Sequence, residues 1–168
     1  AYTDFVLKEL LHLAHRKYRL KNDASAAAFA GFSLGGLSAM DIVWHHPNNF
    51  GKVGVFSGSF WWRSRAFDKK HPDADRIMHH VLHHSMKRPG LKFWLQTGTN
   101  DETADRNNNG IIDSIDDTLD IIRELKRLGY KEVKDIRYVE VEDGEHNFQT
   151  WSEVLADFLT WAFAPKRL

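Results

Sequence analysis

The sequence predicts an α/β fold whose sheet is mainly parallel and flanked by helices. Short apolar runs alternate with longer amphipathic runs through all 168 residues, and this alternation is typical of strand–helix units. The hydrophobic content of 42%, with six Trp and eleven Phe, indicates a chain that can build a core. With no repeat or linker in view, we expect a single domain over 1–168. We expect helices over 3–18, 35–45, 72–86, 115–128 and 148–163, and strands over 26–30, 53–57, 91–97 and 136–141.

The first helix is predicted by apolar side chains that recur at helical spacing between Phe5 and Leu13. The next apolar run, 26–30, consists of small residues and is typical of a short buried strand. The helix that follows must end before Pro47, because proline cannot continue it.

The second half of the chain repeats the pattern. The run 53–57 and two later runs rich in β-branched and aromatic residues predict strands. Pro72 is suited to open a helix, and Gly129 to close one. Trp151 and Trp161 fall on the apolar face of the last helix, where we expect them in the core.

A Gly-x-Ser-x-Gly motif runs from Gly31 to Gly35, between an expected strand and an expected helix. Strand, motif and helix together are typical of a nucleophile elbow, a tight turn that exposes the central hydroxyl, here that of Ser33. The glycines are needed because strand and helix approach each other closely in this turn, and a side chain at either position would collide with the neighbouring backbone. The backbone N–H of Leu34 would then donate one hydrogen bond to an oxyanion.

Two further polar loops follow strands, and the carboxyl ends of parallel strands meet at one edge of a sheet. Asp101 and Glu102 follow the strand over 91–97, and either can supply an acid; we favour Asp101 because it comes first after the turn. His146 follows the last strand. Serine, acid and histidine in this order predict nucleophilic catalysis, in which the histidine takes the proton of Ser33 and the acid orients the histidine.

Three motifs resemble the esterase D-type branch of the α/β-hydrolases, which includes feruloyl, acetyl-xylan and siderophore esterases, S-formylglutathione hydrolase and mycolyltransferases. They are Gly31-Phe32-Ser33-Leu34-Gly35-Gly36, Gly98-Thr99-Asn100-Asp101 and Gly144-Glu145-His146-Asn147. The resemblance implies an α/β-hydrolase fold, a triad of Ser33, Asp101 and His146, and a serine carboxylic-ester hydrolase that forms an acyl-enzyme. Two alternatives stay open: an acyltransferase of the same family, and a non-catalytic, calcium-stabilised binding module.

The chain also departs from this family. Family members carry several strands before the elbow strand, whereas here only one helix precedes that strand. We therefore expect a C-terminal portion of the domain, with the elbow strand at an open sheet edge that pairs with an N-terminal piece or with a second copy. The loop that gives the second oxyanion N–H would be missing, and losing one such donor typically costs about 10²–10³ in rate.

The segment 105–116 matches a calcium-binding loop in register. Oxygen ligands fall at positions 1, 3, 5, 9 and 12, Gly110 allows the sharp turn at position 6, and position 7 contributes a carbonyl. The expected ligands of a structural Ca²⁺ are Asp105, Asn107, Asn109, Ile111, Asp113 and Asp116. The alternative is a surface loop that bends through its own Asn and Asp hydrogen bonds. Calcium bound here would stiffen the loop that presents Asp101. Because such a site fills best where calcium is abundant, a calcium site favours a periplasmic or extracellular location for the protein.

Two other groups of residues are less informative. Trp61 and Trp62 follow the second strand and form either an aromatic wall for a substrate or a core patch. Four histidines between 79 and 84 have i,i+4 spacing suited to zinc or nickel, but no carboxylate completes the set, and we expect a solvated helix face.

The charge and residue content limit the partners. Net charge is zero, with 23 acidic and 23 basic residues, so nothing indicates nucleic acid or an anionic membrane. No run is long and apolar enough for a membrane span, and the absence of cysteine excludes disulfides and thiolate chemistry. We expect a small-molecule or carbohydrate-linked ester as the substrate.

Overall fold

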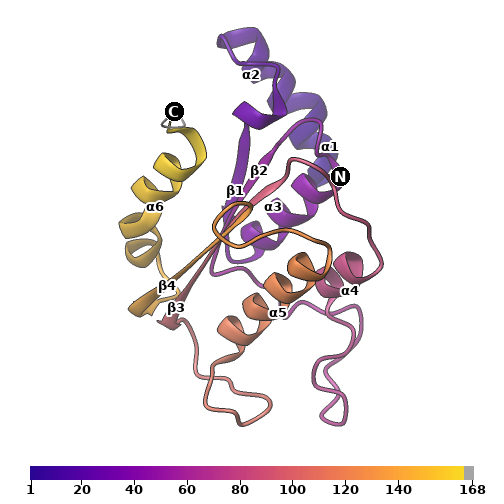
Figure 1. Ribbon diagram of the computed structural model, residues 1–168, viewed down its shortest axis with the longest axis vertical. Helices are drawn as coiled ribbons and strands as arrows, with labels where there is room; N and C mark the ends of the chain where they lie inside the picture. Colours follow the sequence, from indigo (N-terminus) through magenta and orange to yellow (C-terminus); the bar gives the residue numbers. More distant parts are fainter. Residues whose placement is uncertain (165–168) are drawn as a thin grey trace.

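The computed structural model, which describes residues 1–164, contains a four-stranded sheet in which every neighbouring pair is parallel (Figure 1). This confirms the predicted α/β class. The strands lie in the order of the chain, so β1 is at one edge and pairs with β2 alone among the described residues. The strands are β1 (Ala28–Phe32), β2 (Lys52–Phe56), β3 (Lys92–Asn100) and β4 (Ile136–Glu145).

Helices cover both faces of this sheet. The helices α3, α4 and α5 pack on one face and α6 packs on the other (Figure 1). A continuous helical segment, α1–η1–α2, projects beyond the sheet at the N-terminal end (Figure 1). The helices are α1 (Tyr2–Asp4), the π-helix η1 (Phe5–Leu10), α2 (Leu11–Lys17), the 3₁₀ turn η2 (Ala24–Ala26), α3 (Leu34–His45), α4 (Ile77–His83), α5 (Asp113–Arg127) and α6 (Phe148–Phe163).

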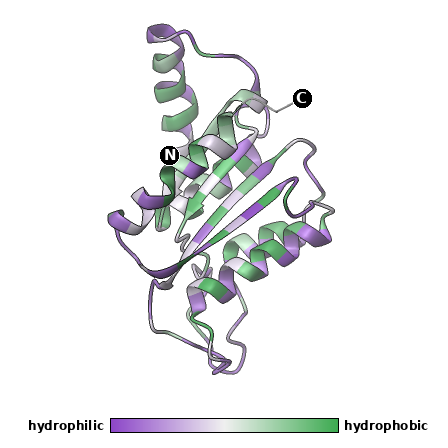
Figure 2. Ribbon diagram, turned by 60° about the vertical axis from the view of Figure 1, so that its left-hand side comes forward, coloured by the Kyte–Doolittle hydropathy of each residue, from purple (hydrophilic) through white to green (hydrophobic). Residues whose placement is uncertain are grey.

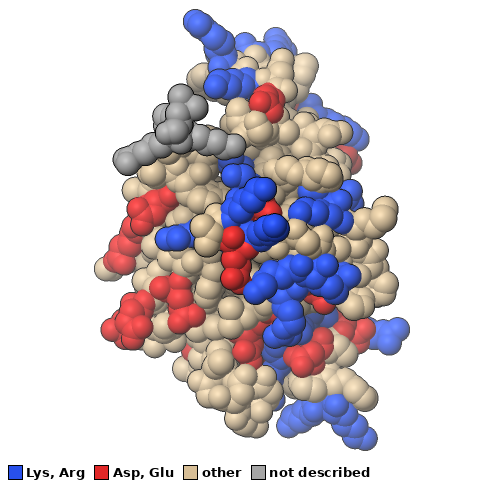
Figure 3. Space-filling model, in the orientation of Figure 1, with Lys and Arg blue, Asp and Glu red and all other residues tan. Residues whose placement is uncertain are grey.

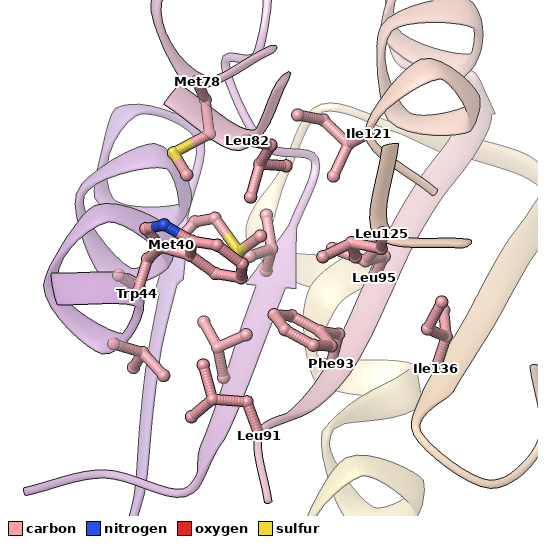
Figure 4. Close-up of a cluster of buried hydrophobic side chains, with 14 of the residues drawn as sticks. Met40, Trp44, Met78, Leu82, Leu91, Phe93, Leu95, Ile121, Leu125 and Ile136 are labelled. Atoms are coloured by element: carbon pink, nitrogen blue, oxygen red, sulfur yellow. The ribbon is translucent and has the colours of Figure 1, made fainter. Parts of the chain in front are cut away.

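Successive side chains of a strand point to opposite faces of the sheet, so the core consists of two clusters. Phe93 and Leu95 of β3 point toward α3, α4 and α5 (Figure 4). The intervening Trp94 packs against α6. Residues along α5 alternate between hydrophobic and hydrophilic, as expected for a helix with one buried face (Figure 2). Gly54 of β2 is required on the α6 side, because a Cβ there would lie 2.7 Å from the Phe158 ring.

The strands β3 and β4 extend three and four residues past their predicted ends at 97 and 141. Two further elements differ from their predicted bounds for local reasons. The helix predicted over 72–86 is confined to α4, because Arg76 before it is extended and buried, with its guanidinium paired to carboxylates of α5. The strand predicted over 26–30 lies two residues later, since residues 24–26 form a 3₁₀ turn capped by Asp23.

The turn between β1 and α3 consists of Ser33 alone, which has φ 54° and ψ −124°. This is a left-handed conformation that costs a non-glycine residue of order 1–3 kcal/mol. The chain can turn so sharply because Gly31 has no side chain. A Cβ at Gly31 would lie 2.2 Å from the Gly35 carbonyl oxygen.

The surface carries charges of both signs. Acidic and basic side chains are interspersed on the face seen in Figure 3 and in places lie next to one another, in keeping with the zero net charge. No helix within residues 1–164 combines the length and the apolarity that crossing a bilayer requires.

His79 on α4 is partly buried, which corrects the expectation of a solvated helix face over 79–84 at this one position; His80, His83 and His84 are exposed as expected. The His79 Nε2 lies 3.0 Å from the Asp117 carbonyl oxygen. Burial, and secondarily the charge of Arg76, lower the pKa of His79 to about 4. The ring is therefore neutral at pH 7, and Nε2–H donates to that carbonyl.

We predict that replacing Gly31 by alanine lowers the free energy of unfolding by at least about 2 kcal/mol, because the new Cβ overlaps backbone that cannot move away. Urea denaturation measures this loss. Gly35→Ala is the matched control, because no atom lies within 4 Å of its Cβ position, and alanine favours the helix. Equal loss in both variants would contradict the close approach.

We also predict that His79 makes the protein less stable in mild acid. The unfolded chain protonates this histidine near pH 6.5, whereas the folded chain does so only near pH 4. Between these values the unfolded state binds the extra proton, so the free energy of unfolding falls as pH decreases, by up to roughly 3 kcal/mol. In His79→Gln, which keeps a donor for the carbonyl, urea titrations from pH 7 to 4 should show a weaker pH dependence. An unchanged dependence would refute this role.

Candidate active site

Ser33, Asp101 and His146 come together at the carboxyl edge of the sheet, from three different strands. Ser33 directly follows β1, Asp101 directly follows β3, and His146 directly follows β4. The Ser33 Oγ lies 3.0 Å from His146 Nε2, and His146 Nδ1 lies 3.8 Å from Asp101 Oδ1. The first distance is that of a hydrogen bond, and the second is too long for one.

The backbone of Ser33 is held on both sides. Its N–H donates to the Phe56 carbonyl at 2.9 Å, and its own carbonyl accepts from the N–H of Ser59 at 3.1 Å. Both partners lie at the end of β2 or just after it. The neighbouring strand and its loop therefore stabilise the left-handed turn that presents the hydroxyl.

The carboxylate of Asp101 is fully buried and has two hydrogen-bond donors. Oδ2 accepts from the N–H of Gly98 at 3.1 Å, and Oδ1 accepts from Ser57 Oγ at 2.9 Å. Burial raises the pKa of Asp101, while these donors and His146 oppose the shift. Of the two acids left open by the sequence, Asp101 is the one placed against His146. Glu102 lies instead near the N–H of Ser114.

Ser57 belongs to the site although sequence reasoning did not select it. It is buried, has φ 46°, donates to Asp101 and accepts a hydrogen bond from Trp151 Nε1 at 2.8 Å. Its position directly after β2 is the signal that was available, since every other polar residue of the site also follows a strand. Trp151, expected only as a core residue, is thus also a hydrogen-bond donor.

His146 is positioned by the start of α6. Asn147 caps this helix by accepting from the N–H of Thr150 at 2.9 Å. The imidazole of His146 meets the Trp151 ring edge to face, with centroids 5.2 Å apart. The side chain of His146 is 40% exposed, so a reactant can reach it from solvent.

A hollow of about 350 Å³ opens over Ser33 and His146. Leu34 lines it and is the first residue of α3, where the backbone N–H has no acceptor within the helix. Trp61 also lines the hollow. Trp62, which we expected beside the substrate, lies outside it, in a separate depression with Arg63 and Phe67.

The segment predicted to bind calcium closes on itself through side-chain hydrogen bonds. The carboxylate of Asp105 accepts from the N–H of Asn109 at 3.2 Å and from the N–H of Gly110 at 2.9 Å. Asp116 Oδ2 accepts from the side-chain amides of Asn107 and Asn109, both at 2.9 Å. These bonds are those of the alternative considered from the sequence. Across residues 1–164, no three His, Cys, Asp or Glu side chains form a group able to hold a metal ion.

A buried ion network fastens this segment to the helices. Arg106 Nη1 lies 3.0 Å from Asp113, and its Nη2 lies 2.9 Å from Asp117 of α5. Arg76 pairs with Asp117 as well and reaches Asp120 at 2.7 Å. Asp113, an expected calcium ligand, is therefore already paired with a guanidinium.

Comparison with known proteins agrees with this architecture. The chain is 34% identical over 89 residues to the iron(III) enterobactin esterase of Dickeya dadantii, a match that covers 53% of this chain and 20% of that protein. The enterochelin esterase structure from Shigella flexneri superposes with a TM-score of 0.76 at 25% identity, over 98% of this chain and 37% of that one. A ferulic acid esterase superposes with a TM-score of 0.71 at 18% identity, over 96% of this chain and 60% of that one.

The chain spans about a fifth to three fifths of the length of these proteins. The structural matches confirm the α/β-hydrolase fold and the resemblance to siderophore and feruloyl esterases expected from the three motifs. A model of the Esterase family, described as "Putative esterase", matches residues 1–162. The protein therefore belongs to the Esterase family of α/β-hydrolases.

Proposed function

We propose that this protein hydrolyses carboxylic esters through an acyl-enzyme on Ser33. The observation that carries the proposal is the 3.0 Å contact between Ser33 Oγ and His146 Nε2, at a strained turn that opens into a hollow. A serine hydroxyl is a weak nucleophile until a base removes its proton, and a neutral imidazole at hydrogen-bond distance is suited to do so.

In this mechanism Ser33 Oγ attacks the ester carbonyl while His146 Nε2 takes its proton. The leaving alcohol then receives that proton, and a bond between the acyl group and Ser33 replaces the ester bond. Water, deprotonated by His146, releases the acid and restores the hydroxyl. The backbone N–H of Leu34 would donate to the oxyanion that forms at each attack.

Asp101 has the role of stabilising the imidazolium that His146 becomes. The 3.8 Å separation allows a charge interaction with that imidazolium, and catalytic hydrogen bonds that are long in the free protein often tighten once the substrate binds. Ser57 and Gly98 hold the carboxylate in place during this step.

We propose a small-molecule or carbohydrate-linked ester as the substrate. The named relatives are esterases for enterobactin and for ferulic acid, and the exposed Trp61 beside Ser33 offers a ring for stacking on such a molecule. We also propose that the free edge of β1 pairs with a further strand, from an N-terminal segment or from a second copy. Support comes from the exposed Ala30 and Phe32 on this edge strand.

Calcium binding by the segment 105–116 is a further proposal. Its support is the register of the oxygen ligands in the sequence and the turn at Gly110, which has φ 85°. The ion would be held by Asp105, Asn107, Asn109, Asp116 and the Ile111 carbonyl, with Asp113 joining if Arg106 releases it. Calcium would stiffen the loop after Asp101, and a periplasmic or extracellular location would keep the site filled.

We predict that a fluorophosphonate probe forms a covalent adduct on Ser33. Mass spectrometry should locate the adduct, and Ser33→Ala should abolish it. His146→Ala should slow labelling at least about 100-fold, because general-base catalysis typically contributes 10²–10⁴. His45→Ala is the matched control, since this exposed histidine lies at the end of α3, outside the hollow. No labelling of the folded wild type would leave a non-catalytic binding module as the better account.

We predict that calcium raises the melting temperature of the protein by roughly 5 °C when its concentration is about 100 times the dissociation constant. A chelator should reverse the shift, and Asp105→Ala should eliminate it. Thr103→Ala, an exposed change in the same loop, should keep it. If neither calcium nor chelator changes the melting temperature of the wild-type protein, the calcium proposal is wrong.

A further inference from the structure

Two polar atoms of residues that line the hollow over Ser33 have no hydrogen-bond partner within residues 1–164. They are Glu102 Oε1 and Ser114 Oγ, and both are shielded from solvent. A buried polar atom left without a partner typically costs about 1–3 kcal/mol. Such atoms at the wall of a cavity indicate a place where a ligand supplies the missing bonds.

The two residues come from opposite ends of one loop. Glu102 directly follows Asp101 after β3, and Ser114 lies in the first turn of α5. Ser114 is only 9% exposed, and both side chains line the hollow that also contains Ser33 and His146. The carboxylate of Glu102 contacts the N–H of Ser114, but Glu102 Oε1 and Ser114 Oγ have no role in this contact or in the proposed hydrolysis.

The surroundings favour a neutral group that donates a hydrogen bond. Burial and the nearby carboxylates of Asp113, Asp117 and Asp101 raise the pKa of Glu102. An anionic substituent would meet these like charges, whereas a donor relieves them. A hydroxyl can donate to Glu102 and accept from Ser114 at once, so a single group satisfies both residues.

We propose that Glu102 and Ser114 form a subsite that binds a hydroxyl group of the substrate, and so orient a hydroxylated ester over Ser33. This proposal rests on the proposed esterase function and adds a specificity determinant to the same site. Glu102 would then recognise the substrate, whereas the neighbouring Asp101 faces His146.

Binding of unreactive amides tests the subsite without requiring hydrolysis. One pair, 3-hydroxybutyramide and butyramide, probes the acyl side. The other, N-(2-hydroxyethyl)acetamide and N-ethylacetamide, probes the alcohol side. We expect NMR titration of the wild-type chain to show about tenfold tighter binding of the hydroxylated member in at least one pair. Glu102→Leu should abolish the preference, Ser114→Ala should reduce it, and Glu153→Leu, an exposed acid of α6, should leave it unchanged.

The isosteric variant Glu102→Gln is included because Glu102→Leu could lose the preference merely by failing to fold. It retains an acceptor oxygen without the charge, and we expect the preference to fall to about threefold. The proposal is overturned if neither pair shows a preference in the wild type, or if the preference survives both substitutions at Glu102. Fluorophosphonate labelling of Ser33 remains a separate measurement. Labelling without a hydroxyl preference defeats this subsite alone, and a preference without labelling defeats the esterase function alone.

Discussion

The common direction of the four strands is the constraint on which the rest of this structure depends. Because β1 to β4 are parallel and lie in chain order, their carboxyl ends share one edge. Ser33, Ser57, Asp101 and His146 each follow a different strand within a residue or two, so they meet there although 113 residues separate Ser33 from His146. A reversal of any one strand would send its polar residue to the opposite edge.

At that edge, one buried set of hydrogen bonds joins three elements. Trp151 of α6 donates to Ser57 after β2, and Ser57 donates to Asp101 after β3. The same Trp151 ring stacks on Phe32 of β1, with centroids 4.9 Å apart. A tryptophan that is part of the α6 core thus also fixes the position of the buried carboxylate. Packing of α6 and the geometry around His146 are therefore expected to be coupled.

The loop after Asp101 is held mainly by charge. Arg106 and Arg76 bring carboxylates of α5 and the preceding loops together, in a setting where removing one partner would leave an uncompensated buried charge. This network fastens the base of the segment 105–116, while its tip closes through Asn and Asp hydrogen bonds. A calcium ion would thus act on a loop that already has a firm base, and Arg106 would compete with it for Asp113.

The sequence by itself determined the class of fold, the strand–serine–helix turn and the order of serine, acid and histidine, because hydrophobic period and glycine placement act locally. It also predicted β1 at a sheet edge. It did not reveal Ser57, the partners of Arg76 and Arg106, or the Glu102 Oε1 and Ser114 Oγ atoms that lack a partner within residues 1–164. Those depend on distances between residues far apart in the chain, as does the choice of Asp101 over Glu102. Tertiary structure decided them, because which side chains face each other is set by how α5 and α6 pack on the sheet.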